Sequence, residues 1–187
     1  SMTVHNEQVA INETGAKSIT AGQMLDHEME TVARKLIASW AENPSLSLLL
    51  KCGFELYPDV SLLYPVLEAL ELKLFNKSSS LFSEVKTAEY VISDLLRAAS
   101  TSIGYKPNNH YPKNVNVSGF REELAAFAKR LLQEGNFPWY VKQQAILFLI
   151  TNGDFGFSID EKQEELNLYK LLHNTSLYQT NGTSNIL

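Results

Sequence analysis

The sequence "GNFPWYVKQQAILFLITNGD", residues 135 to 154, predicts one complete helix with both ends marked. Pro138 suits the first helical turn, because its ring fixes φ and its missing N–H needs no partner there. Gly153 suits the residue after the end, which often adopts a left-handed conformation. The run from residue 145 to residue 150 is entirely apolar. We therefore expect the second half of this helix, including Phe148, to be covered on several sides.

Helical periodicity recurs along most of the chain. Apolar residues at spacings of three and four predict an amphipathic helix of about six turns over residues 20–42. A later helix offers Phe82 and Tyr90, among others, for packing. In all, the pattern predicts about seven helices and almost no credible strand, so the expected fold class is all-α.

Residue types that favour helix ends mark the predicted boundaries. We expect Asn43 to cap a helix that starts at Pro44 and stops before Gly53. Pro65 is expected to start the next helix or to kink it. The other predicted caps are Thr20, Ser79 or Ser80, Ser118 and Ser158.

The arrangement of the helices follows less directly from the sequence. Short connections predict antiparallel helical hairpins. The helices expected at Pro44 and Pro138 share a proline start, an apolar second half and a glycine stop, which favours a stack of hairpins. An irregular closed helical bundle is the alternative.

We expect one α-helical domain over residues 19–173. Residues 1–18 and 174–187 are predicted to be a flexible lead-in and a flexible tail, because they are polar and lack a sustained period. Residues 100–117 break all periodicity and predict a long loop.

Composition limits the classes of function. The chain has 187 residues and a net charge of -5, so no overall field attracts nucleic acid or an anionic membrane. Cys52, the single cysteine, lies in an apolar run and is expected to be a small buried side chain rather than a nucleophile. No apolar run reaches the ~18 residues needed to cross a bilayer, and no signal-peptide core is present. A cytoplasmic location is the resulting expectation.

The search for chemistry finds no catalytic motif. No two of the histidines stand three or four residues apart, so no HExxH zinc pair exists. The chain also lacks a GxSxG elbow and a glycine-rich phosphate loop. Asp26 and Glu30 share a helix face, which is compatible with a metal site or with acidic residues that complement the helix dipole. We predict no catalytic residue, no metal and no cofactor.

Two groups of side chains are candidates for binding a macromolecule, since aromatic rings beside cations suit partner contacts and base stacking. The first lies at the start of the helix after Pro138, where a packed first turn is the alternative explanation. The second lies in the predicted loop, where such composition is also common without a function. The candidate binding residues are Trp139, Tyr140 and Lys142 in the first group, and Tyr105, Lys106, His110, Tyr111 and Lys113 in the second.

The stretch "FPWYVKQQAILFLITNGD", residues 137–154, resembles the second helix of a HEAT-like repeat, in which a Trp-x-x-x-Gln-x-Ala-Leu pattern recurs. The matching residues are Trp139, Gln143, Gln144, Ala145 and Ile146. The resemblance implies that the expected stack of hairpins is a HEAT-like one.

Residues 42–63, "ENPSLSLLLKCGFELYPDVSLL", look like the helical repeat region that follows the polymerase core of some bacterial defence-type reverse transcriptases. The polymerase core itself is absent, because Tyr57-Pro-Asp-Val60 is not a Tyr-x-Asp-Asp motif. The resemblance implies an accessory domain of a longer enzyme and transfers no catalytic residue.

We therefore expect a non-catalytic helical-repeat domain that binds a macromolecule, either a partner protein or single-stranded nucleic acid, within a bacterial reverse transcriptase. The alternative is a small helical enzyme whose site combines dispersed residues such as Asp26, Glu30 and His110. A buried carboxylate pair in a concave pocket would favour the enzyme.

Overall fold

A computed structural model describes residues 21–103, 111–134 and 136–153. These residues form six α-helices and one short 3-10 helix, and they contain no strand, so the predicted all-α class is confirmed. The elements are α1 (Ala21–Glu42), α2 (Ser47–Leu56), α3 (Val60–Leu74), η2 (Lys77–Ser79), α4 (Phe82–Thr101), α5 (Val117–Glu134) and α6 (Trp139–Thr151).

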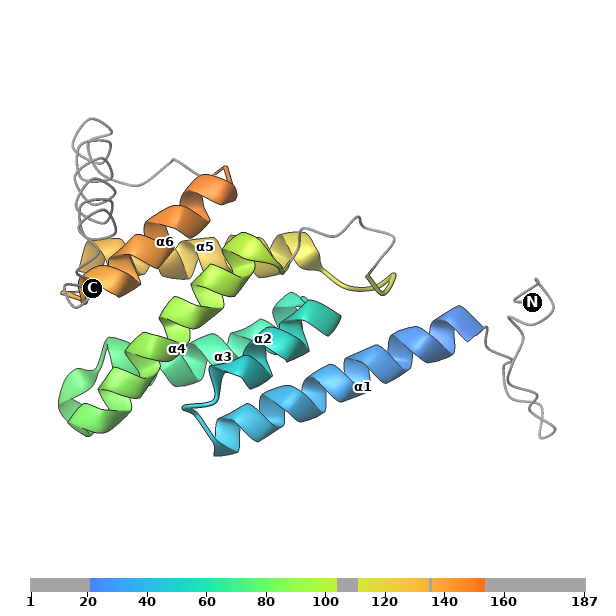
Figure 1. Cartoon of the computed structure of the whole chain (residues 1–187), viewed down its shortest axis with the longest axis horizontal. Coiled ribbons are helices and arrows are strands. Elements are labelled where there is room, and N and C mark those ends of the chain that lie inside the picture. Colours follow the sequence, from blue (N-terminus) through green and yellow to red (C-terminus); the bar gives the residue numbers. More distant parts are fainter. Residues whose placement is uncertain (1–20, 104–110, 135, 154–187) are drawn as a thin grey trace, which may run out of the picture.

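Helix α4 is central to the arrangement, since it packs against α2, α3, α5 and α6 (Figure 1). Helix α1 packs mainly on α2 and lies at the edge. Along the chain, consecutive helices alternate in direction (Figure 1), and α1 with α2, α3 with α4 and α5 with α6 pack against each other. The HEAT-like repeat arrangement stays a prediction.

All six helices contribute to one hydrophobic core. Phe54 of α2 and Phe120 of α5 meet there, with ring centroids 5.0 Å apart. Phe148 is fully buried, as are Ala145 and Leu149 on the same helix. The prediction that the second half of α6 is enclosed is therefore confirmed.

Two predicted boundaries of α2 are wrong. The helix begins at Ser47 rather than Pro44, because the side-chain amide of Asn43 donates to Ser39 O (3.1 Å) and ends α1 instead of starting α2. Gly53 lies inside the helix, where a Cβ atom would stand 3.1 Å from Ile37 Cγ1. The glycine therefore permits close packing of α2 on α1 rather than a helix stop.

Of the other predicted helix ends, some agree with the structure and others are corrected by it. Gly153 has a φ of 71°, which confirms it as the left-handed residue that follows α6. Pro65 lies inside α3, which begins at Val60. Asn116 replaces Ser118 as the cap of α5, because its Oδ1 accepts the Gly119 N–H at 2.8 Å.

Helix α4 starts later than expected, and it buries most of the apolar residues expected to pack, among them Val91, Ile92 and Leu96. It begins at Phe82, after the 3-10 turn that contains Ser79. Phe82 and Tyr90 are exposed, although packing was predicted for both. Cys52 is also exposed, because it lies on the outer face of α2, opposite Leu50 and Phe54.

Several predictions concern segments outside the described residues. These are the flexible lead-in at 1–18, the cap at Thr20, the central part of the 100–117 loop, the last helix after Ser158 and the tail at 174–187.

Candidate functional site

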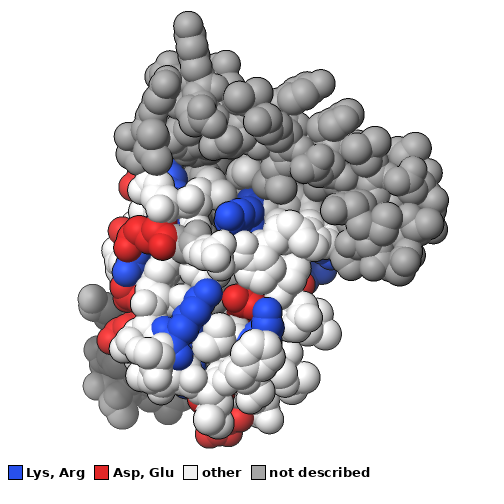
Figure 2. Space-filling model, turned by 90° about the vertical axis from the view of Figure 1, so that its left-hand side faces the viewer, with Lys and Arg blue, Asp and Glu red and all other residues white. Residues whose placement is uncertain are grey.

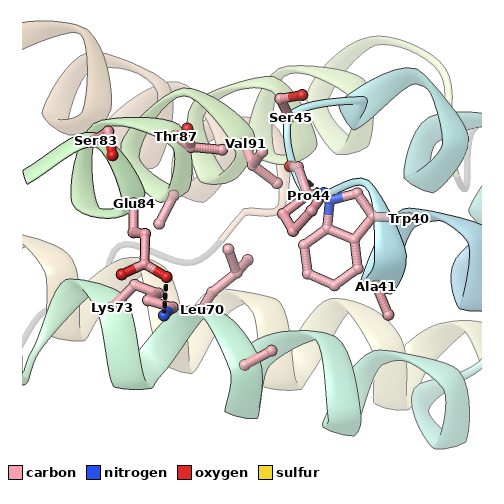
Figure 3. A pocket seen from close by; sticks show the side chains of 12 residues that line it. Trp40, Ala41, Pro44, Ser45, Leu70, Lys73, Ser83, Glu84, Thr87 and Val91 are labelled. Carbon is pink, nitrogen blue, oxygen red and sulfur yellow. Dashed lines mark hydrogen bonds and ion pairs between the residues drawn. The ribbon is translucent and has the colours of Figure 1, made fainter. Parts of the chain in front are cut away.

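A groove lies between α3 and α4 and is closed at one end by the last turn of α1 (Figure 3). Its volume is about 600 Å³. Most of the side chains that line it are apolar or small. They are Trp40, Ala41, Pro44, Ser45, Ala69, Leu70, Lys73, Ser83, Glu84, Thr87, Ala88 and Val91.

The floor of the groove is built by buried residues from three helices. Trp40 comes from α1, Leu70 from α3 and Val91 from α4, and each is almost completely buried. The indole Nε1 of Trp40 donates to Pro44 O at 3.0 Å. This bond holds the turn after α1 against the ring, and the two together form the end wall of the groove (Figure 3).

An ion pair closes the opposite end of the groove. Lys73 Nζ, in the last turn of α3, donates to Glu84 Oε2 at 2.8 Å (Figure 3). Glu84 Oε1 accepts the Leu81 N–H at 3.0 Å and thereby caps the start of α4. The hydrogen bond from Lys73 is the main cause that lowers the pKa of Glu84, and the bond from Leu81 adds to it. The pair is neutral overall, so the groove has no excess charge.

Large apolar side chains are exposed beside the residues that line the groove. Leu46 follows Ser45 in the turn after α1, and Leu81 and Phe82 precede Ser83. Phe82 is 76% exposed. Exposed apolar clusters at the edge of a hollow are typical of interaction sites.

The predicted binding residues at the start of α6 pack against other side chains of the chain. The Tyr140 ring stacks on Tyr90, with centroids 5.2 Å apart and planes 9° apart, and Trp139 meets Tyr140 edge-on. Burial is the main cause that raises the pKa of Tyr140, and the Glu89 carboxylate adds to it. Lys142 is half-buried on the next turn. This packing favours the alternative of a packed first turn.

The end of the molecule where α4 and α6 begin carries both basic and acidic side chains, spread among uncharged residues (Figure 2). The Lys and Arg side chains on the described part of this face are separate rather than gathered into one patch (Figure 2). Lys77 Nζ lies over the ring of the buried Phe137, 4.4 Å from its centroid. The cation and the ring are thus engaged within the chain.

The described part of the second predicted group lies elsewhere. Tyr111 is only 7% exposed, and Lys113 is exposed while its backbone N–H donates to the Asp26 carboxylate at 3.4 Å. Lys113 therefore lies beside the first turns of α1, whereas Tyr140 packs on Tyr90 of α4. Tyr105, Lys106 and His110 lie outside the described residues.

The acidic residues of α1 have partners within the fold. Asp26 binds the chain before α5 through Lys113, and Glu30 forms an ion pair with Arg34 at 2.8 Å. Burial is the main cause that raises the pKa of the nearby Tyr57, and Glu30 adds to it. In the part of the chain that the structure describes, no three His, Cys, Asp or Glu side chains are placed to hold a metal ion.

The groove was not identified from the sequence. Trp40 and Leu70 belong to the apolar stripes of two separate helices, and nothing in their spacing in the sequence places them beside Val91. The available signal was a tryptophan near a helix end, three residues before Asn43.

The fold and the groove define an all-α protein with an apolar surface hollow between helices. Comparisons of the chain with protein-family models, with curated proteins and with solved structures find no match. Among the described helices, none combines the length and the apolar character required to span a bilayer.

Proposed function

We propose that this chain is a non-catalytic helical domain that binds another protein, and that it does so by accepting an amphipathic helix of the partner in the α3–α4 groove. The observation that carries the proposal is the groove itself, with Trp40, Leu70 and Val91 on its floor. Its volume falls within the roughly 300–1,000 Å³ of typical ligand sites.

The proposed mode of binding follows from the geometry of two neighbouring antiparallel helices. A third helix fits into such a groove with apolar residues at every third or fourth position. Exposed Leu46, Leu81 and Phe82 provide further apolar contact at the edge. Burial of these side chains is the expected source of affinity, since hot spots are apolar anchors that fill pockets.

A partner protein fits the surface better than nucleic acid. The net charge is -5, and the aromatic rings expected to stack on bases are themselves packed, with Tyr140 on Tyr90 and Tyr111 buried. Base stacking requires accessible ring faces beside cations. A cytoplasmic location and a longer reverse transcriptase as parent protein belong to the same proposal, the latter on the resemblance alone.

Selection from a displayed library of helical peptides tests this function. Ala69→Arg places a long charged side chain in the groove, and Ala38→Arg makes the same change on the exposed face of α1, away from it. We expect peptides selected on the wild-type chain to bind Ala38→Arg normally and Ala69→Arg at least about tenfold more weakly. Selected peptides that bind both variants equally, or a failure to select any, would overturn the proposal.

A further inference from the structure

We infer that the partner helix carries carboxylate side chains at one end, and that a second hollow along α4 binds them. This inference rests on the proposed function and specifies the chemistry of the partner. The second hollow has a volume of about 240 Å³ and lies between α2 and α4. Its lining residues are Ser47, Leu48, Lys51, Asp94, Arg97, Ala98 and Thr101.

The groove and the second hollow lie along one side of α4. Residues of this helix that line the two hollows recur at intervals of three or four, as neighbours on a helix face do. From the start of the helix, the row with this spacing is Glu84, Thr87 and Val91 in the groove, then Asp94, Ala98 and Thr101 in the second hollow, and Ser83, Ala88 and Arg97 line the same hollows beside it. From Glu84 to Thr101 the helix rises about 26 Å, which a partner helix of about five turns can follow.

The turn between α1 and α2 separates the two hollows. Pro44 and Ser45 line the groove, whereas Ser47 and Leu48 line the second hollow. Ser47 Oγ donates to Asp94 Oδ2 at 2.6 Å and holds the turn against α4. Leu46 on this turn and Leu48 in the first turn of α2 are exposed, so a partner that crosses here meets apolar side chains.

The charges of the second hollow favour an acidic partner. Lys51 and Arg97 are both exposed, and neither forms an ion pair with a carboxylate among the residues that the structure describes. Asp94 is the one acidic residue in the lining, and Ser47 donates to it. Two cations therefore face one carboxylate. The guanidinium group matches a carboxylate in a two-bond geometry, which gives the site its chemical preference.

The inferred ligand is thus an amphipathic helix with two regions. Its apolar residues fill the groove above Trp40, and its Asp or Glu residues reach Lys51 and Arg97. Charge at the edge of an interface mainly contributes specificity and the rate of association. The apolar region therefore provides most of the affinity, and the acidic region selects the partner.

The same library of displayed helical peptides provides the test. We expect peptides selected on the wild-type chain to be enriched in Asp and Glu at one end of the apolar stripe. The double variant Lys51→Glu/Arg97→Glu should bind them about tenfold more weakly, because like charges then meet. The control Arg34→Glu/Lys35→Glu changes net charge equally at exposed positions of α1 outside both hollows and should bind normally.

The outcomes separate this inference from the proposed function. Peptides that depend on Ala69 but show no acidic enrichment, and that bind Lys51→Glu/Arg97→Glu normally, would overturn the inference and leave the proposed function intact. Peptides indifferent to Ala69→Arg would overturn both. Single-stranded RNA that binds the wild-type chain and Ala69→Arg equally, but not Lys51→Glu/Arg97→Glu, would also overturn the inference and assign the cations to nucleic acid.

Discussion

At the scale of single residues, the phenylalanines differ in burial and therefore in their expected contribution to stability. Phe148 is fully buried, with the Arg121 guanidinium 5.3 Å from its ring centroid, whereas Phe82 is mostly exposed. Phe148→Ala should lower the free energy of unfolding by about 3–5 kcal/mol, because it leaves a cavity in the core. Phe82→Ala should change it by less than about 0.5 kcal/mol. Urea unfolding followed by circular dichroism measures both; a loss below about 1 kcal/mol for Phe148→Ala would contradict an enclosed α6.

The exposure of Cys52 gives a second prediction at this scale. Because the thiol lies on the outer face of α2, a colourimetric thiol reagent should modify the native protein at a rate similar to that of the urea-unfolded chain. The chain has one cysteine, so Cys52→Ser should abolish the reaction and serves as the control. Modification that occurs only after unfolding would place Cys52 in the core.

At the scale of elements, the contact of α1 with α2 depends on Gly53. A side chain there meets Ile37 Cγ1 and the backbone of Ala33. Gly53→Leu should therefore destabilise the protein by about 1–3 kcal/mol through overpacking. In the double variant Gly53→Leu/Ile37→Ala, space is restored and part of the loss should be recovered. Chemical unfolding of the four proteins gives the coupling energy, and a purely additive result would argue against direct contact.

The link between α3 and α4 should respond to pH. The pKa of Glu84 is lowered in the folded chain, so its contribution to stability is complete above its ordinary pKa of 4.5 and is lost as the pH falls through the lowered value. Glu84→Gln removes this contribution. The difference in stability between wild type and Glu84→Gln should thus be largest near neutral pH and shrink in acid. Thermal unfolding at several pH values measures it, and a difference that grows on acidification would contradict the assignment.

At the scale of the whole molecule, α4 is the helix that most others contact. It packs against four other helices, and Ile92, Leu96 and Ala99 are completely buried. In contrast, Leu25 in the first half of α1 and Val32 at its middle are exposed. Hydrogen exchange should therefore be slowest in α4 and fastest in the first half of α1. Exchange followed by mass spectrometry checks this order, and equal protection of α1 and α4 would contradict it.

The sequence predicts those features that depend on local chemistry. Turn geometry and apolar periodicity act within a few residues. They therefore predicted the start of α6 after Pro138, its stop at Gly153 and the burial of Phe148. Gly53 and Asn43 were misassigned for a physical reason. A glycine serves equally as a helix stop or as a point of close packing, and only the neighbouring helix decides between them.

The candidate site was harder to predict than the helices. Trp40, Leu70 and Val91 come from three helices and meet only after these have packed, so no spacing in the sequence signals the groove. The aromatic residues near Pro138 formed a visible cluster, yet Tyr140 uses its ring to pack on Tyr90. Local composition thus indicated a plausible surface but did not establish its accessibility.

The Glu84 carboxylate both forms an ion pair at the end of the groove and caps the start of α4. Glu84 receives Lys73 on one oxygen and the amide of Leu81 on the other. A ligand in the groove that displaced Lys73 would change the charge balance at the Glu84 carboxylate. The stability of the first turn of α4 would then change as well. The NMR chemical shift of the Leu81 amide would then report whether the groove is occupied, without an attached dye.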